Sequence, residues 1–473
     1  MRLTIKKRIK SALAKAKMAL TVMRRTCGKV LGHRAKVGPP RAYLRQAQSQ
    51  RTLTCFSALS NAAGNPMGAA AGGLRRTLAS SGLGDGRAAL SAASRGRDVH
   101  CRALKTGIVG LPNVGKSTLF NALVEGSKAE SANYPFCTIE PNVGTVPVPD
   151  QRLHELSAIS KSKSTVSTTI EFVDIAGLVA GASKGEGLGN KFLSHIREVD
   201  AIVHVVRCFE DTDVVHVDGS VDPLRDADVI ETELALSDMD QIERRLQRLK
   251  KGGKGKKGAD AGDVEAEKKV LETIYETVEK GTPARKADLS EEDFELVKGL
   301  GLLTMKPVIY AGNVAEDDLM DEAASNPHAK ALREKAESEN ARFVLVSAKM
   351  EEELVELGGE ERQEFLDGFG IKQTGLQTLI QVAYEMLGLR TYFTSGEKET
   401  RAWTIVSGMT APQAAGVIHT DFAKGFIRAE TVGYEDFVTS GSQAAAKEKG
   451  LLRSEGKEYV VQEGDVILFR FNV

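Results

Sequence analysis

The stretch Gly110-Leu111-Pro112-Asn113-Val114-Gly115-Lys116-Ser117 decides the fold of this chain. It matches the pattern G-x-x-x-x-G-K-[ST] at every fixed position, which is typical of a phosphate-binding loop. Thr106–Val109 before it predicts a short apolar strand, and Ser117–Leu123 after it predicts the start of a helix. This order places backbone N–H groups and a helix N-terminus around phosphate oxygens. The chain is therefore predicted to bind a nucleoside triphosphate.

Two side chains of the loop have distinct expected roles. Lys116 is predicted to reach the β- and γ-phosphates, and the Ser117 hydroxyl is predicted to hold Mg²⁺. Lys116 is therefore a candidate catalytic residue, and Ser117 is a candidate metal ligand.

Charge divides the chain into two parts. Residues 1–104 contain 21 basic and two acidic residues, whereas the remainder carries 43 basic and 62 acidic residues. The first part is rich in Arg, Ala, Ser and Gly, and this composition predicts a disordered, transit-peptide-like leader. We expect an organellar protein, in the mitochondrion or the plastid, with a cytoplasmic protein as the alternative. A nucleic-acid-binding tail and an untranslated extension are two further interpretations of the leader.

The composition also excludes some classes of protein. No run of eighteen apolar residues occurs, so we expect no membrane-spanning helix. The five cysteines form no C-x-x-C pair, which argues against a zinc site and a disulfide framework. No feature of the sequence demands a second copy or DNA, and we expect a monomer.

From Lys105 onward, short apolar strands alternate with helical stretches. The expected strands after the first are Thr169–Val173, Ala201–Val206, Pro307–Gly312 and Phe343–Val346. This alternation predicts an α/β fold whose parallel sheet is covered on both faces. Residues 389–473 predict a smaller α+β module, because they end in an alternating strand.

A charged helical segment interrupts this alternation. Val229–Leu249 and Val264–Glu279 predict two arms of a helical hairpin, joined by a Gly/Lys-rich link. Eight basic residues and no acidic residue lie between Arg244 and Lys257. A solvated loop is one interpretation of these charges, and a contact to RNA phosphate or an acidic partner is the other.

A second motif, Asp174-Ile175-Ala176-Gly177, follows the expected strand Thr169–Val173. After a phosphate-binding loop, a D-x-x-G predicts a switch: Asp174 holds a Mg²⁺-bound water and the Gly177 amide binds the γ-phosphate. Thr138 is the candidate for closing over Mg²⁺. Leu178 stands where many switch GTPases place a water-orienting Gln, so we expect slow turnover or help from another group.

Recognition of the base is expected at Asn313-Val314-Ala315-Glu316, after the strand Pro307–Gly312. Guanine-specific switch proteins have N-K-x-D there. In this chain Val314 replaces the Lys and Glu316 replaces the Asp, so adenine becomes a candidate base. Ser347-Ala348-Lys349 follow the next strand and are expected to contribute backbone contacts to the base.

These motifs, with Tyr134-Pro135-Phe136-Cys137-Thr138-Ile139-Glu140-Pro141-Asn142 between them, resemble the Obg-like ATPase (YchF) family over residues 105–473. The resemblance implies a P-loop NTPase of the TRAFAC class in two parts, 105–224 and 304–388. It also implies a coiled-coil insertion at 225–303 and a β-grasp TGS domain at 389–473. The implied activity is hydrolysis of ATP, often alongside GTP, with Mg²⁺.

The resemblance also carries over residue roles and partners. It assigns nucleotide contacts to Asn113, Val114, Gly115, Lys116, Ser117 and Thr118, with Mg²⁺ on Ser117 and Thr138. Val314 is implied to contact adenine through its backbone, flanked by Asn313. His216 stands at the position of a proposed catalytic His, with an ordinary surface His as the alternative. An Asn at the position of Asn113 supports activation by monovalent cations in related enzymes, which implies a K⁺ requirement. The implied partner is the ribosome, either its large subunit or its RNA.

Three functions follow as hypotheses. The first is an ATPase that also accepts GTP and controls ribosome docking in translation or stress responses. The second is a ribosome- or RNA-binding module in which nucleotide is mainly structural. The third is a conventional translational GTPase. A P-loop kinase is a weaker alternative, because nothing in the sequence resembles an acceptor-binding lid.

Overall fold

The computed structural model describes residues 104–130, 143–175, 188–211, 219–252 and 259–472. Thr138, Gly177 and His216 lie outside these residues, as does the leader. The described residues belong to one unit, which spans Val99–Val473. Within them, no helix combines the length and apolar character needed to cross a membrane.

The first sheet contains the strand that leads into the phosphate-binding loop. Its strand order is β2-β4-β1-β5-β6-β7, and all neighbours are parallel except β2 and β4. Its strands are β1 Lys105–Val109, β2 Val143–Pro147, β4 Thr169–Asp174, β5 Ala201–Arg207, β6 Val308–Asn313 and β7 Arg342–Val346. The predicted parallel sheet is confirmed for five of these strands. The antiparallel edge strand β2 was not predicted.

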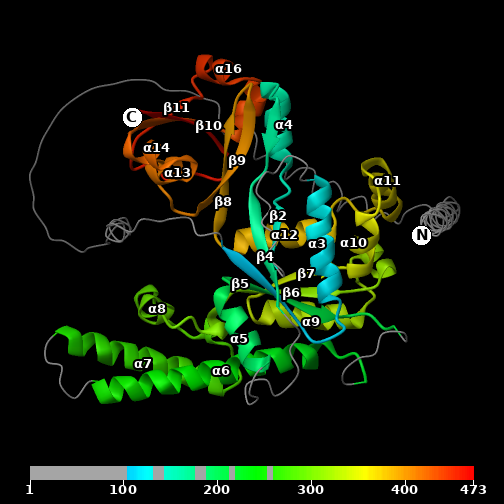
Figure 1. Cartoon of the computed structure of the whole chain (residues 1–473), viewed down its shortest axis with the longest axis vertical. Coiled ribbons are helices and arrows are strands. Elements are labelled where there is room, and N and C mark those ends of the chain that lie inside the picture. The colour runs from blue at the N-terminus through cyan, green and yellow to red at the C-terminus, as the bar shows by residue number, and fades with distance from the viewer. Residues whose placement is uncertain (1–103, 131–142, 176–187, 212–218, 253–258, 473) are drawn as a thin grey trace, which may run out of the picture. The chain divides into compact units, whose positions relative to one another are not determined.

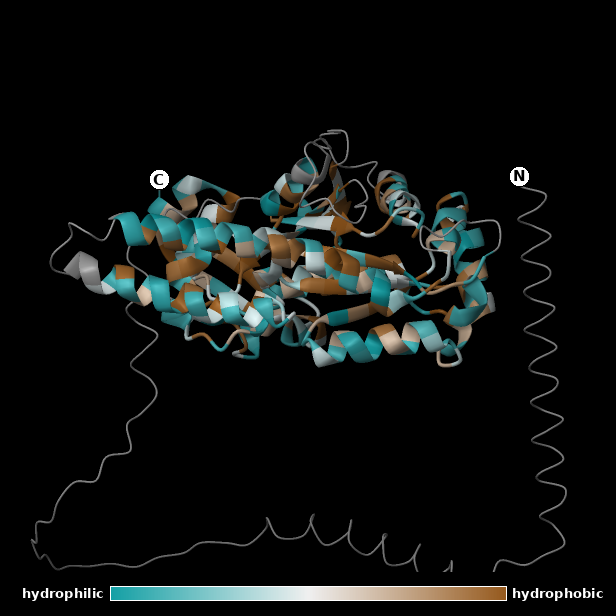
Figure 2. Ribbon diagram, turned by 90° about the horizontal axis from the view of Figure 1, so that it is seen from below, coloured by the Kyte–Doolittle hydropathy of each residue, from teal (hydrophilic) through white to brown (hydrophobic). Residues whose placement is uncertain are grey.

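The central strands are apolar because both faces of the sheet are covered. All seven residues of β5 and all six of β6 are buried. Helices α3, α9 and α12 pack against the strands (Figure 1). Figure 2 shows apolar strands in the interior and more polar helices around them. The helices of this part are α3 Lys116–Glu130, α5 Leu188–Glu198, α9 Pro327–Ser338, α10 Ala348–Val355, α11 Gly359–Phe369 and α12 Gly375–Met386, with a 3₁₀ helix η4 at Glu316–Asp321.

The helical hairpin is present as predicted. Helix α6, Pro223–Gly252, and helix α7, Ala259–Glu279, lie side by side (Figure 1). The bidentate pair of Arg245 and Glu267 joins them, with N···O distances of 2.6 and 2.9 Å. Three short elements follow before β6: η2 Ala284–Lys286, α8 Glu291–Lys298 and η3 Leu303–Met305.

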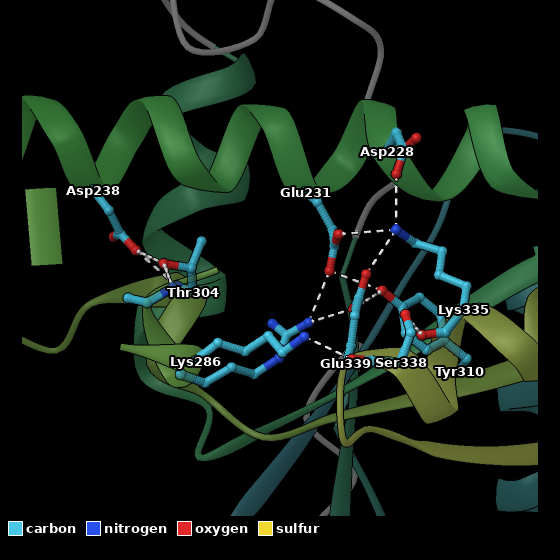
Figure 3. Close-up of polar contacts among 11 residues, drawn as sticks. Asp228, Glu231, Asp238, Lys286, Thr304, Tyr310, Lys335, Ser338 and Glu339 are labelled. Carbon is cyan, nitrogen blue, oxygen red and sulfur yellow. Dashed lines mark hydrogen bonds and ion pairs between the residues drawn. The ribbon is translucent and has the colours of Figure 1, made fainter. Parts of the chain in front are cut away.

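A cluster of charged side chains fixes the base of the hairpin to the first sheet; we call it the anchor cluster (Figure 3). Its members are Glu231 on α6, Arg285 on η2, Tyr310 on β6, and Lys335 and Glu339 on α9. The Arg285 guanidinium lies 2.9 Å from the Glu231 carboxylate and 2.8 Å from that of Glu339. The Tyr310 hydroxyl donates to the same two carboxylates, at 2.8 and 2.9 Å.

The charges of the anchor cluster compensate one another. Burial by itself would raise the pKa of Glu231, but Arg285 and Lys335 hold it at about 2. Burial and the adjacent carboxylates of Glu231 and Glu339 raise the pKa of Tyr310, so its hydroxyl stays a donor. Because removing one member leaves an uncompensated charge, the cluster strongly favours one placement of the hairpin base.

The second sheet has the order β11-β10-β12-β8-β9-β3. Five of its strands lie in the predicted C-terminal module: β8 Leu389–Ser395, β9 Glu399–Val406, β10 Phe426–Gly433, β11 Arg453–Glu455 and β12 Asp465–Phe471. The module also contains the helices α13 Ala411–Ile418, α14 Thr420–Lys424, α15 Tyr434–Ser440 and α16 Gln443–Glu448.

The sixth strand of this sheet comes from a distant part of the chain. Strand β3, Ser164–Val166, pairs in parallel with β9. Helix α4, Gln151–Ser160, precedes it and buries Leu153 and Leu156 among residues of the C-terminal module. The segment between β2 and β4 therefore completes the second sheet, an arrangement that the sequence did not predict.

Candidate functional site: a phosphate-binding loop beside a base cavity

The phosphate-binding loop lies between β1 and α3, as its sequence predicts. Asn113 has a left-handed backbone, with φ of 61°. Gly115 has φ of 94°, and a Cβ atom there would lie 2.5 Å from the Asn313 side-chain nitrogen. Only glycine fits this position, because the backbone must approach Asn313 closely.

The Lys116 side chain is buried at the start of α3, with 7% of it exposed. Its ammonium group donates to the Leu111 carbonyl at 2.7 Å. Burial lowers its pKa, and the Asp174 carboxylate opposes that shift. An added polyphosphate anion would supply the negative charge that a buried ammonium group requires.

Asp174 ends β4 on the strand adjacent to β1. Burial raises its pKa, and Lys116 opposes the shift. Its Oδ1 atom is buried and accepts no hydrogen bond from the described residues. Ser117 is exposed and lines the cavity described below. A carboxylate oxygen without a donor and an accessible hydroxyl fit a hard divalent cation such as Mg²⁺.

A cavity of about 580 Å³ opens beside the loop. Most sequence-predicted binding residues line it: Asn113, Gly115, Lys116, Ser117, Thr118, Asn313, Val314, Glu316 and Ser347. Val114 does not line it, because its side chain is buried in the core. The volume is appropriate for a small-molecule ligand.

Asn313 joins two parts of this cavity. Its side-chain nitrogen donates to the Val114 carbonyl at 2.9 Å, and its side-chain oxygen accepts from the Ala348 N–H at 3.0 Å. Asn313 is only 3% exposed. The predicted base-recognition residue therefore fastens the phosphate-binding loop to the start of α10.

The predicted acidic residue of the base site has a basic neighbour. The Glu316 carboxylate lies 3.5 Å from the Lys349 ammonium group. Val314 is 2% exposed and its side chain packs in the core, and the residue also lines the cavity. The Ser347 hydroxyl is buried and has no hydrogen-bond partner among the described residues.

Sequence reasoning missed several residues that line the cavity. They are Phe209, Glu210, Asp211, Asp317 and Glu352, whereas Ala315, Ala348 and Lys349 belong to segments expected to contact the base. Phe209–Asp211 follow the buried strand β5 after one intervening residue, Cys208. Because ligands of α/β proteins bind outside the carboxyl ends of parallel strands, their position in the sequence was an available signal.

A parallel sheet, a complete phosphate-binding loop and an adjacent Asp174 define this protein as a P-loop nucleoside-triphosphate hydrolase. Comparison with family models agrees. A model described as 50S ribosome-binding GTPase matches residues 105–242. The model for the C-terminal part of YchF GTPases, described as a protein of unknown function (DUF933), matches residues 389–472.

Whole-chain relatives identify the family. The ribosome-binding ATPase YchF of Bacillus subtilis (strain 168) is 56% identical over 371 residues, which cover 78% of this chain and 100% of that protein. The ribosome-binding ATPase YchF of Escherichia coli O157:H7 is 53% identical over 369 residues, with 78% and 99% coverage. The structure of the Schizosaccharomyces pombe YchF GTPase matches with a TM-score of 0.71 and 40% identity, covering 78% of this chain and 98% of that one. The chain belongs to the YchF family.

Proposed function

We propose that this protein is a Mg²⁺-dependent ATPase that also accepts GTP, and that its nucleotide state controls association with a ribosome. One observation carries the nucleotide part: the phosphate-binding loop and the Asn313–Glu316 segment line a single cavity. The ribosome part rests on the relatives, which are ribosome-binding ATPases by name.

The chemistry follows from the loop. The triphosphate lies along the amides that lead from Asn113 to Thr118, and Lys116 neutralises charge on the β- and γ-phosphates. Ser117 and Thr138 would hold Mg²⁺, and Asp174 would hold a water bound to it. The ion, when bound, would spread the charge of the phosphate oxygens. Catalysis of in-line attack by water rests on positioning and on electrostatic stabilisation.

Adenine is the proposed base. Val314 cannot cover the base with a charged stem as Lys does, and Glu316 has a longer side chain than the Asp that guanine-specific switch proteins use there. The Glu316 Oε1 atom is buried and has no hydrogen-bond partner in the described part of the chain, so it is available to accept from guanine and GTP is proposed as a second substrate.

The partner and cation requirements extend this proposal. The basic end of α6, which includes Arg248, Lys250 and Lys251, is the proposed contact to phosphates of large-subunit RNA. K⁺ is a proposed activator, on the strength of Asn113 in the loop. The proposed state is a monomer.

Targeting of the leader is a separate proposal. The 21 basic and two acidic residues of positions 1–104 support import into a mitochondrion or plastid. Fusion of residues 1–104 to a fluorescent protein tests it by microscopy: organellar fluorescence is expected, and diffuse cytoplasmic fluorescence would contradict it.

The first experiment measures hydrolysis of ATP and GTP by the full chain with Mg²⁺, with and without K⁺ and ribosomes. We expect slow turnover that prefers ATP and rises with K⁺. Strict preference for GTP would favour the conventional translational GTPase.

A second experiment separates a switch from a nucleotide-stabilised binding module. Lys116→Ala removes the cation that contacts the phosphates. If the variant sediments with ribosomes as the wild type does, whether or not nucleotide is present, the module hypothesis is favoured. If the wild type sediments only with nucleotide and the variant fails to sediment under the same condition, the switch is supported.

A further inference from the structure

One wall of the cavity is the segment that leads from β7 into α10. Ser347, Ala348 and Lys349 line the cavity, and Glu352 joins them one helical turn later. A helix start is usually supported by its own N-cap side chain, but the Ser347 hydroxyl makes no capping hydrogen bond in the described part of the chain. Contacts from elsewhere in the fold therefore have to hold this wall in place.

Glu351 connects this wall to helix α12. Its backbone N–H donates to the Ser347 carbonyl at 2.9 Å, within the first turn of α10. Glu351 is buried, and its carboxylate accepts from the Leu376 N–H at 2.9 Å. Hydrogen bonds from the Thr374 side chain and the Gly375 backbone also stabilise the charge of this carboxylate. One side chain of α10 is therefore bonded to three consecutive residues at the start of α12, where unpaired N–H groups favour a negative charge.

The start of α12 is itself held close to the first sheet. A Cβ atom at Gly375 would lie 2.6 Å from the Leu345 carbonyl oxygen and 3.0 Å from the Val346 Cα atom, so only glycine allows this approach to the end of β7. Thr374 begins a capping box that satisfies backbone N–H groups in the first turn of α12. The Glu351 carboxylate is therefore bonded to a well-fixed part of the fold.

We propose that Glu351 is a positioning residue for nucleotide binding, which holds the Ser347–Lys349 wall where the base of the nucleotide requires it. The inference rests on the proposed function, since it requires a nucleoside triphosphate in this cavity. Glu351 does not line the cavity, so it acts through α10 and not by contact with the nucleotide. The phosphates bind on a different element, the loop that leads into α3. Glu351 therefore contributes to the affinity for the base and not to the affinity for the phosphates.

The test compares three probes on the full chain: Mg-ATP, Mg-GTP and Mg-tripolyphosphate, each titrated by calorimetry. Tripolyphosphate has the phosphates without a base. In Glu351→Ala, affinity for both nucleotides is expected to fall roughly tenfold, because only about a tenth of the molecules then have the wall in its binding position. Affinity for tripolyphosphate is expected to stay within about twofold, because the phosphate-binding loop shares no hydrogen bond with Glu351 in the described part of the chain.

Asp238→Ala is the matched control. Asp238 is also a buried carboxylate, and it accepts from the Leu303 N–H at 2.8 Å and from the N–H and hydroxyl of Thr304, both at 2.7 Å (Figure 3). It lies on α6 of the helical hairpin and does not line the cavity. Its truncation removes the same chemistry, so it is expected to lower the melting temperature without weakening nucleotide binding.

Two conservative variants examine the contact itself. Glu351→Gln keeps an acceptor oxygen at the same reach and is expected to bind nucleotide more tightly than Glu351→Ala. Glu351→Asp keeps the charge but shortens the side chain by a methylene group. It is expected to weaken nucleotide binding and to leave tripolyphosphate binding unchanged. If Glu351→Ala does not fold, as thermal melting would reveal, Glu351→Asp decides.

The outcomes are distinguishable. If the wild type binds neither nucleotide, the proposed function itself fails. If the wild type binds both and the shortened Glu351 variants bind them equally well, this inference alone is overturned. Equal losses for nucleotide and tripolyphosphate would also overturn it, because Glu351 would then support the whole site. The same holds if Asp238→Ala loses as much nucleotide affinity as Glu351→Ala, since a general loss of stability would explain both.

Discussion

The side-chain oxygen of Asn313 accepts a hydrogen bond from the backbone N–H of Ala348 at 3.0 Å. This contact joins the end of β6 to the start of α10, and the other half of the same amide group reaches the Val114 carbonyl. One buried side chain therefore links the phosphate-binding loop to the cavity wall at the start of α10.

Asn313→Ala is expected to weaken ATP binding by tenfold or more. It leaves the buried Val114 carbonyl and Ala348 N–H without their partners, which costs about 1–3 kcal/mol for each buried group. Calorimetric titration with Mg-ATP and thermal melting measure the two effects. Asn313→Asp is the informative companion, because it keeps the acceptor for Ala348 and loses the donor to Val114. Unchanged affinity in Asn313→Ala would contradict the linking role.

Asp174→Asn is expected to raise the Mg²⁺ concentration needed for half-maximal hydrolysis by at least tenfold. The substitution removes the charge of a carboxylate whose Oδ1 atom has no donor in the described part of the chain. Titration of Mg²⁺ at saturating ATP measures the shift. Glu171→Gln, on the same strand, is the control, since Glu171 pairs with Lys105 at 3.5 Å and lies outside the cavity lining. An equal Mg²⁺ requirement in both variants would argue against Asp174 as a metal-site residue.

Tyr310→Phe is expected to lower the free energy of unfolding by about 1.5–3 kcal/mol, the range for hydrogen bonds to charged groups. The substitution removes the donor shared by Glu231 and Glu339 and leaves the ring in place. Urea denaturation measures the change. Tyr275→Phe is the matched control, because the Tyr275 hydroxyl bonds the Glu243 carboxylate at 2.9 Å at the surface. Because water competes for this hydrogen bond, a smaller loss of unfolding free energy is expected for Tyr275→Phe. Equal losses in the two variants would show that the hydrogen bonds of the anchor cluster add no stability.

The stability of the protein is expected to depend on pH through Glu351, which is 4% exposed on α10 and accepts from the Leu376 N–H at 2.9 Å. Burial raises the pKa of Glu351 to about 6. Because the folded-state pKa lies above the unfolded value, its stabilising effect is fully present below about pH 4.5. The effect is lost as the pH rises through about 6.

Glu351→Gln tests this dependence. The wild type is expected to lose about 2 kcal/mol relative to this variant between pH 4.5 and pH 7, from a pKa difference of about 1.5 units. Melting temperatures of both proteins across this range measure the difference. Parallel curves for the two proteins would show that Glu351 does not titrate in the folded protein.

The nucleotide site was largely predictable because its signals are local. The loop Gly110–Ser117 needs glycine where the backbone turns, and the apolar strands Ala201–Arg207 and Val308–Asn313 carry β-branched residues in short runs. Residues after such strands meet at one edge of a parallel sheet. Asn313 and Ser117 were therefore brought together as expected. Thr138, Gly177 and His216 stay predictions, since they lie outside the described residues.

The second sheet was not predictable in the same way. Strand β3 has only three residues, and its partner Glu399–Val406 lies more than two hundred positions along the chain. No local pattern encodes such a pairing. The contact of Arg207 was not predictable either. Its place at the end of β5 gives no sign that its guanidinium group stacks on the Phe209 ring.

The sequence by itself determined the elements whose conformation depends on neighbouring residues: the phosphate-binding loop, the buried strands and the helical hairpin. Glycine conformation and apolar periodicity depend on a few neighbouring positions, so the local sequence is enough to predict these elements. Only the tertiary structure decided that the segment between β2 and β4 completes the second sheet and that Arg285 and Tyr310 share two carboxylates. These contacts join distant residues, and their strength depends on burial that only the folded chain provides.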